Sequence, residues 1–132
     1  MSDAKIKINE NHIRLGKFGE EFAYEQTKDL FSSKNKPTAL ITGGIGASTG
    51  ALRALKELKI KPGKDVAFVA LDEWPMFDVL TSDLSSVYRD PEEMGRQSAR
   101  LILELIADKA PSQAIVPTTY RARSSSKALS RA

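Results

Sequence analysis

Apolar positions along the chain recur at two spacings, one typical of helices and the other of short buried strands. Three segments carry an apolar stripe at the helical spacing and predict helices: Gly19 to about Ser32, residues 47–58, and Pro91 to about Ala107. Asp90-Pro91-Glu92-Glu93 marks the start of the third helix, because Asp caps a helix, proline fits its first turn and carboxylates favour its positive end. The inward positions predicted for the three helices are Ala23, Thr27, Leu30 and Phe31; Ala47, Ala51, Ala54, Leu55 and Leu58; and Met94, Leu101, Ile102 and Leu105.

Short apolar runs lie between these helices and predict strands. Residues 38–42 and 66–71 are bounded by turn residues, and the run 66–71 is typical of a strand buried on both faces of a parallel sheet. A further short strand is expected at 84–88, and two last strand pieces at 114–116 and 119–121. This order of elements predicts an α/β fold with a mostly parallel sheet flanked by helices.

The composition fits one globular domain. The chain has 132 residues, of which 41% are hydrophobic and 28% charged, enough to bury a single core. The first 36 residues contain no apolar run, so the sequence shows neither a secretory signal nor a membrane span. The absence of cysteine excludes disulfides and thiolate metal sites, and together these features predict a cytoplasmic protein with no membrane contact. We expect the domain to occupy residues 1–123 and residues 124–132 to form a disordered tail.

The net charge of +3 does not indicate nucleic-acid binding by this chain. All 17 acidic residues precede Lys109, whereas five of the 20 Lys and Arg residues lie at or after it. The basic excess therefore belongs to the C-terminal end. Because DNA binding needs basic side chains clustered on a folded face, we interpret this end as a solvated terminus.

The glycine-rich segment after the first strand contains a possible nucleophile motif. Gly46-Ala47-Ser48-Thr49-Gly50 matches the G-x-S-x-G pattern of hydrolases. In that fold the histidine follows the serine, whereas the single histidine of this chain, His12, precedes Ser48. Without a base the serine is not activated, so we expect Ser48 or Thr49 to cap the helix instead.

The wider segment Thr42–Gly50 is similar to a dinucleotide-binding turn, in which small residues let the backbone approach a pyrophosphate. Asp72, at the end of the next strand, falls where a ribose-binding acid is expected, although Thr49 occupies the place of the last glycine. A small nucleotide-binding oxidoreductase therefore stays open as an alternative.

No residues point to a metal or to acid–base catalysis. His12 lies in a polar stretch with no second ligand nearby. The paired carboxylates Glu20-Glu21 and Glu92-Glu93 each fall in the first turn of a predicted helix, where they complement its dipole. We therefore predict no catalytic residue, no cofactor and no metal, and a protein that is not an enzyme.

An ordered set of short motifs runs through residues 16–125. The segments are Gly16-Lys17-Phe18 with Gly19-Glu20-Glu21, Pro37–Leu40, Gly50–Leu58 (G-A-L-R-A-L-K-E-L), Pro62–Glu73, Leu84–Val87 (L-S-S-V), Glu93–Arg96 (E-M-G-R) and Val116–Ser125. In content, order and spacing this set resembles the LacI/GalR family of transcription regulators.

The resemblance implies a periplasmic-binding-protein-like fold of type I, with a small-molecule effector in a cleft between two α/β lobes. It implies a repressor's sensor domain, which binds a sugar or nucleobase-like effector, forms a homodimer and controls DNA binding by a helix-turn-helix head. Relative to the family, this sequence has no counterpart of the head or of most of the amino-terminal lobe. It corresponds to the C-terminal lobe plus one helix of the other lobe, from Pro91, so we expect an exposed apolar strip along Leu101 and Leu105.

The resemblance also implies effector-binding residues. Asp72 matches the acid that accepts hydrogen bonds from ligand hydroxyls or ring nitrogens, and Phe18 matches an aromatic that stacks on the ligand. Met94 and Arg89 match positions that border the cleft. The family commonly has Asn-Asp where this chain has Gly44-Ile45, so the backbone at Gly44 takes the place of a polar side chain there.

A transport binding protein shares the implied fold and is a further alternative. Such a protein must be secreted, and no signal peptide is visible in this sequence. The G-A-L-R-A-L helix and the strand that ends at Asp72 also favour the regulators.

Overall fold

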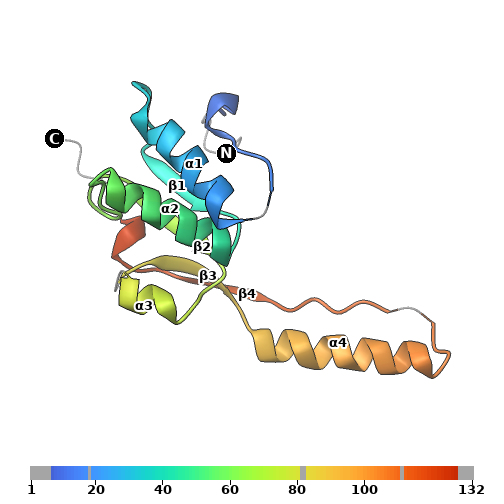
Figure 1. The fold of residues 1–132 in the computed structure, drawn as a ribbon. Coiled ribbons are helices and arrows are strands. Elements are labelled where there is room, and N and C mark those ends of the chain that lie inside the picture. Colours follow the sequence, from blue (N-terminus) through green and yellow to red (C-terminus); the bar gives the residue numbers. More distant parts are fainter. Residues whose placement is uncertain (1–6, 18, 81–82, 111, 128–132) are drawn as a thin grey trace.

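The computed structural model describes residues 7–17, 19–80, 83–110 and 112–127. Helices and strands alternate along most of the chain (Figure 1). The elements are a 3-10 helix η1 (Glu10–His12), α1 (Glu20–Ser32), β1 (Ala39–Thr42), α2 (Ile45–Glu57), β2 (Ala67–Leu71), α3 (Met76–Leu80), β3 (Ser85–Arg89), α4 (Pro91–Ile106), β4 (Thr118–Arg121) and a 3-10 helix η2 (Ser124–Ser126).

The strands form one sheet in the order β1-β2-β3-β4. β1, β2 and β3 are parallel, with Leu40 opposite Phe68 and Val69 opposite Ser85, whereas β4 is antiparallel to β3. Because parallel neighbours need a crossover, α2 connects β1 to β2 and α3 connects β2 to β3. The α/β fold with a mostly parallel sheet, predicted from the sequence, is confirmed.

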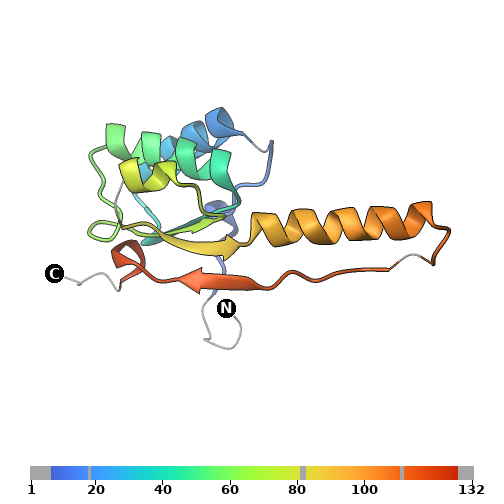
Figure 2. The same cartoon turned by 90° about the horizontal axis from the view of Figure 1, so that it is seen from below.

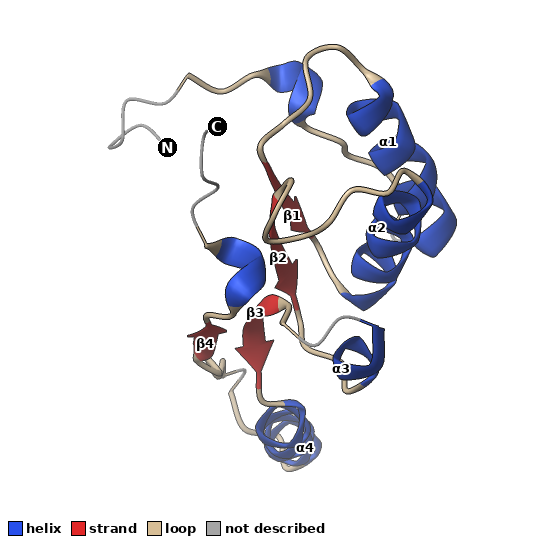
Figure 3. Ribbon diagram, turned by 90° about the vertical axis from the view of Figure 1, so that its left-hand side faces the viewer, coloured by secondary structure: helices blue, strands red, loops and turns tan. Residues whose placement is uncertain are grey.

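The core lies between the sheet and the helices α1, α2 and α3, which are on one side of the sheet in Figure 3. Most positions of the predicted stripes are buried, among them Leu30 and Phe31 in α1 and Ala51 and Leu55 in α2, while the end positions Ala23, Ala47 and Leu58 are half-buried. The buried residues pack with Phe68, which is fully buried near the start of β2. Burial of these apolar side chains is the main stabilising contribution to the fold.

The helices α1 and α2 pack very closely at Gly50. A Cβ placed on Gly50 would lie 2.0 Å from the backbone oxygen of Glu20, so only glycine fits at this contact. On the outer side of the pair, Arg53 of α2 forms ion pairs with Glu20 and Glu21 of α1, at 2.8 and 2.7 Å. Small residues inside and ion pairs outside therefore hold α1 against α2.

The opposite face of the sheet is less covered than the sequence predicts. Phe68 and Ala70 of β2 are buried, whereas Val69, which points to the other face, is only half-buried, and its neighbour Ile41 is 65% exposed. The expectation of a strand buried on both faces is therefore met on one face only. The short helix η2 contacts β2 and β3 on this second face and covers part of it (Figure 3).

Helix α4 projects away from the rest of the molecule (Figure 2). It has no buried residue, so the predicted inward face packs on nothing within the described chain. Of the two residues expected to be exposed, Leu105 is 55% exposed whereas Leu101 is half-buried, and its neighbour Ile102 is 57% exposed. The strand predicted at 114–116 is wrong: these residues run beside α4 with no strand pairing, and Ile115 is 86% exposed.

The C-terminal serines are part of the fold, and the expected disorder from Ser124 onward is wrong for residues 124–127. Ser125 is buried, and its hydroxyl donates to the carbonyl oxygen of Phe68 at 2.7 Å and accepts from the backbone N–H of Ser85 at 2.8 Å. These bonds join β2 to β3 at the point where their ladder begins, so the backbone groups there are satisfied. The expected tail of residues 128–132 lies outside the described residues.

Within the described ranges, no helix is both long enough and apolar enough to span a bilayer.

Candidate functional site

A groove of about 640 Å³ opens at the carboxyl edge of the parallel strands. Five parts of the chain meet there: the start of α2, the turn after β2, the end of β3, the first turn of α4, and the segment from the end of β4. Ligands of open α/β sheets bind at this edge, because loops diverge there and side chains point into the gap. The lining residues are Ile45, Asp72, Glu73, Pro75, Tyr88, Arg89, Pro91, Met94, Arg121 and Arg123.

The backbone of Asp72 turns the chain out of the sheet at this groove. Its N–H donates to the carbonyl oxygen of Val87 at 3.0 Å, which extends the pairing of β2 with β3 by one residue. Its φ of 72° lies in the left-handed region, which aspartate tolerates better than most residues. The position of Asp72 is therefore fixed by the sheet on one side and by a tight turn on the other.

The Asp72 carboxylate forms a two-point ion pair with Arg89. Nε of Arg89 donates to Oδ1 at 2.6 Å and Nη2 donates to Oδ2 at 2.5 Å. This pairing raises the pKa of the Arg89 guanidinium above its usual value, through the hydrogen bonds first and the charge of Asp72 second. A carboxylate has about four acceptor sites, so Asp72 retains lone pairs for a ligand while Arg89 fixes its orientation.

A second charged cluster forms the other end of the groove. Glu73, whose side chain is 15% exposed, accepts hydrogen bonds from Arg121 and Arg123. The guanidinium of Arg121 stacks 3.7 Å from the ring centre of Tyr88, and Arg123 also donates to the carbonyl oxygen of Leu84 at 2.7 Å. Arg123 is thus bound into the protein, whereas Arg121 lies on the groove surface with its side chain 44% exposed.

The structure brings together three of the five residues that the resemblance implies. Asp72, Arg89 and Met94 line the same groove. Gly44 directly precedes the lining residue Ile45, so the position where the family has a polar side chain presents an apolar one. Phe18 lies outside the described residues.

Sequence reasoning missed Glu73, Tyr88, Arg121 and Arg123 as groove residues. The signal for Glu73 was its place beside Asp72 at a strand end, and for Tyr88 its place beside Arg89. The two arginines pair with Glu73 across 48 and 50 residues of sequence, a contact that only the antiparallel return of β4 creates.

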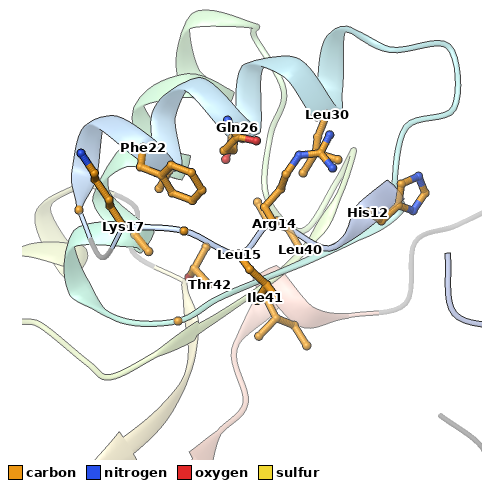
Figure 4. Close-up of a pocket in the computed structure, with 16 residues that line it drawn as sticks. His12, Arg14, Leu15, Lys17, Phe22, Gln26, Leu30, Leu40, Ile41 and Thr42 are labelled. Carbon is orange, nitrogen blue, oxygen red and sulfur yellow. The ribbon is translucent and has the colours of Figure 1, made fainter. Parts of the chain in front are cut away.

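A second hollow, of about 270 Å³, lies between the segment 12–17, α1 and β1 (Figure 4). Leu15, Phe22 and Leu40 line it, and its lining is mainly apolar. It runs along the side of β1, whereas the groove lies across the strand ends, and it contains no carboxylate. The groove is therefore better suited to a polar ligand.

The nucleophile reading of the glycine-rich segment does not fit the structure. Ser48 is fully buried, and its hydroxyl bonds to Thr42 at 2.7 Å and donates to the Gly44 carbonyl at 2.9 Å, so it cannot act as a nucleophile. The expected capping role is also wrong: α2 begins at Ile45 after Gly44, and Ser48 and Thr49 bond back to carbonyls of the first turn. Gly50, the motif's last glycine, serves the packing of α1 on α2.

The ring nitrogen Nε2 of His12 donates a hydrogen bond to the Asn35 carbonyl oxygen at 3.0 Å. In the part of the chain that the structure describes, no three His, Cys, Asp or Glu residues are grouped so that they could hold a metal ion.

The sequence and the fold both have known relatives. Residues 1–126 match the family described as periplasmic binding protein-like domain. The HTH-type transcriptional repressor PurR of Proteus mirabilis is 29% identical over 109 residues, which cover 83% of this chain and 32% of the relative. The chain thus spans about a third of the length of the curated relatives it matches.

Solved structures show the same relationship. A transcription regulator from Staphylococcus saprophyticus matches with a TM-score of 0.80 and 26% identity, over 94% of this chain and 47% of that one. A regulatory protein of the LacI family from Chloroflexus aggregans matches with a TM-score of 0.77 and 26% identity, over 96% of this chain and 46% of that one.

Because the match extends over residues 1–126, the chain belongs to the family of periplasmic binding protein-like domains. Within it, the chain corresponds to part of the effector domain of LacI/GalR-type regulators, as the motifs in residues 16–125 predict.

Proposed function

We propose that this chain is the effector-sensing part of a LacI-type transcriptional repressor, and that it binds a sugar or nucleobase-like molecule in the groove at the carboxyl edge. The observation that carries the proposal is the position of Asp72, Arg89 and Met94. Three separate elements place these residues around one opening, at the edge where open α/β sheets bind ligands.

The lining suits a ligand with a polar and an apolar side. Asp72 offers free lone pairs to hydroxyl or N–H donors, and Tyr88 offers an aromatic ring. Ile45 and Met94 supply apolar contacts from α2 and α4. This chain forms one wall of the cleft, and we place the other wall on the second lobe of a longer protein.

In this proposal the protein is a cytoplasmic homodimer and not an enzyme. The effector shifts an equilibrium between lobe arrangements, and a helix-turn-helix head elsewhere in the longer protein binds DNA in one of them. A ligand shifts such an equilibrium only by its difference in affinity for the two states. The contacts of the ligand with Asp72 therefore contribute to regulation only if they differ between the open and the closed cleft.

The test is a thermal-shift screen of this chain with sugars, nucleobases, nucleosides and NAD(P). A ligand that binds only the folded state raises the unfolding midpoint. At 100 times its Kd, such a ligand adds about 2.7 kcal/mol to the free energy of unfolding. We expect a sugar or a nucleobase to raise the midpoint. We expect Asp72→Asn to weaken the apparent affinity, fitted from the dependence of this rise on ligand concentration, at least tenfold.

The matched control is Asp108→Asn. Asp108 also has a left-handed backbone, with φ of 53°, but lies at the end of α4 away from the groove. Its replacement should leave the response unchanged. Stabilisation by NAD(P) alone would support the oxidoreductase alternative and contradict the proposal, as would a sugar response that Asp72→Asn does not alter.

A further inference from the structure

The charged side chains of the groove are not balanced, although the proposed effectors are neutral. Three arginines, Arg89, Arg121 and Arg123, line it with two carboxylates, Asp72 and Glu73. Each guanidinium comes from a different part of the chain: the end of β3, the end of β4, and the segment before η2. The lining therefore carries one positive charge in excess.

Two of the arginines retain donors that the protein does not use in these pairs. The contacts of Arg89 with Asp72 use Nε and Nη2, so Nη1 takes no part in them. Arg121 contacts Glu73 through Nη1, and its Nη2 takes no part in that contact. Both side chains line the groove and are close to half exposed, at 47% and 44%, so they are accessible to a ligand there.

The ion pairs orient these donors without consuming them. Asp72 holds the guanidinium of Arg89 at two points, and the Tyr88 ring lies 3.7 Å from that of Arg121. A planar guanidinium held on one edge presents its other edge in a fixed direction, which suits the paired oxygens of a phosphate or a carboxylate.

We infer that the effector is anionic: a polyol that bears a phosphate or carboxylate group. Its hydroxyls donate to Asp72, and its anionic group accepts from Arg89 and Arg121. This inference rests on the proposed function and narrows its ligand class from neutral sugars and nucleobases to their charged derivatives.

The test compares ligands with the same ring, each titrated into the 132-residue chain. Binding is followed by the NMR signals of the backbone amides and of the arginine side chains. Glucose, glucose 6-phosphate and glucuronate differ only at C6, which carries a neutral hydroxymethyl group, a phosphate ester or a carboxylate, and inorganic phosphate controls for the anion alone. We expect the phosphorylated or the carboxylated sugar to bind about tenfold tighter than glucose, the factor for one added charge-assisted hydrogen-bond pair. Which of the two binds tighter identifies the anion.

Arg121→Gln and Arg89→Gln should each abolish this preference, because each removes one anion donor. Arg123 still pairs with Glu73 in the first variant, so the fold keeps that contact. Arg100→Gln is the matched control, since Arg100 lies on α4 and pairs with Glu104 outside the groove. It should leave the preference intact.

Three results would overturn the inference. Glucose or a nucleoside binding as tightly as the anionic sugars would overturn it while leaving the proposed function standing. Inorganic phosphate binding as tightly as glucose 6-phosphate would show an anion site with no contribution from the polyol. No change at any groove residue with any ligand would overturn the inference and the proposed function together.

Discussion

The contact between α1 and α2 at Gly50 allows a quantitative test of the packing. Gly50 lies in the interior of α2 with no side chain, and the neighbouring backbone of α1 occupies the space that a Cβ would need. The perturbation is Gly50→Ala, which adds one methyl group. Two opposing effects follow from it, and the structure decides which is larger.

Alanine is the better helix former, and in a helix interior it favours folding over glycine by about 1 kcal/mol. Against this, the added Cβ would lie 2.0 Å from the Glu20 oxygen and 2.9 Å from the Tyr24 nitrogen, whereas ordinary contacts begin at 3.4 Å. Both are backbone atoms, so α1 as a whole must withdraw by more than an ångström and lose packing against Ala51 and Leu55. Overpacking of this kind costs about 1–3 kcal/mol, or more when the neighbour is backbone. We expect a net loss of at least about 1 kcal/mol.

The assay is thermal and urea unfolding followed by circular dichroism. For a domain of this size, 1 kcal/mol corresponds to a fall of about 4 °C in Tm. Gly46→Ala is a matched control in the same helix, because its Cβ would meet the Glu20 nitrogen at an ordinary 3.6 Å. Gly95→Ala in α4 is a second control, because no atom lies within 4 Å of the added Cβ. We expect it to raise only the helical circular dichroism signal. A Gly50→Ala protein as stable as the wild type would refute the close packing of α1 on α2.

Three further predictions follow from other contacts. Ser125→Ala leaves the buried Ser85 N–H and Phe68 carbonyl without their partner, so it should lower the free energy of unfolding in urea by about 1–3 kcal/mol. Ser124→Ala is the control and should lower it little, because the Ser124 hydroxyl makes no hydrogen bond within the described residues. Equal effects of the two variants would contradict the bridging role of Ser125. The pKa of Glu57 is lowered, first by the hydrogen bond from Lys28 and then by that from Tyr24, so its stabilising contribution is present above the unfolded pKa and lost as the pH falls through the folded pKa. The difference in urea midpoint between wild type and Glu57→Gln should therefore shrink from pH 6 to pH 3, and a constant difference would contradict this linkage. The exposed strip of α4 should cause concentration-dependent self-association in sedimentation velocity, which Ile102→Gln with Leu105→Gln reduces; an unchanged profile of the double variant would place the association elsewhere.

The elements could be predicted from the sequence because they depend on local patterns, and part of the groove could be predicted from the family resemblance. Apolar spacing located α1, α2 and α4 within a few residues of their observed ends. The resemblance implied Asp72 and Arg89, and they lie near each other because the parallel strands β2 and β3 end at a common edge. The resemblance also implied Met94, which joins them because α4 begins two residues after β3.

The rest depends on contacts between distant segments. No local pattern pairs Glu73 with Arg121 and Arg123, because those contacts arise from the register of β4 against β3. A serine run has the composition of a disordered tail. Ser125 is buried because its hydroxyl pairs with the backbone N–H of Ser85 and the carbonyl of Phe68, at the start of β3 and β2. Gly50 likewise belongs to a motif in the sequence, while the packed structure gives it a different role.

The central claim is that a small polar ligand binds at the carboxyl edge, with Asp72 and Arg89 in contact with it. The most direct test is to titrate the ¹⁵N-labelled chain with glucose, glucose 6-phosphate and adenine and to map the amide shifts. We predict that the largest shifts fall on residues 72–73, 88–90, 92–94 and 121, and that Asp72→Asn suppresses them. Shifts that gather instead around Leu15, Phe22 and Leu40, in the hollow beside β1, would contradict it.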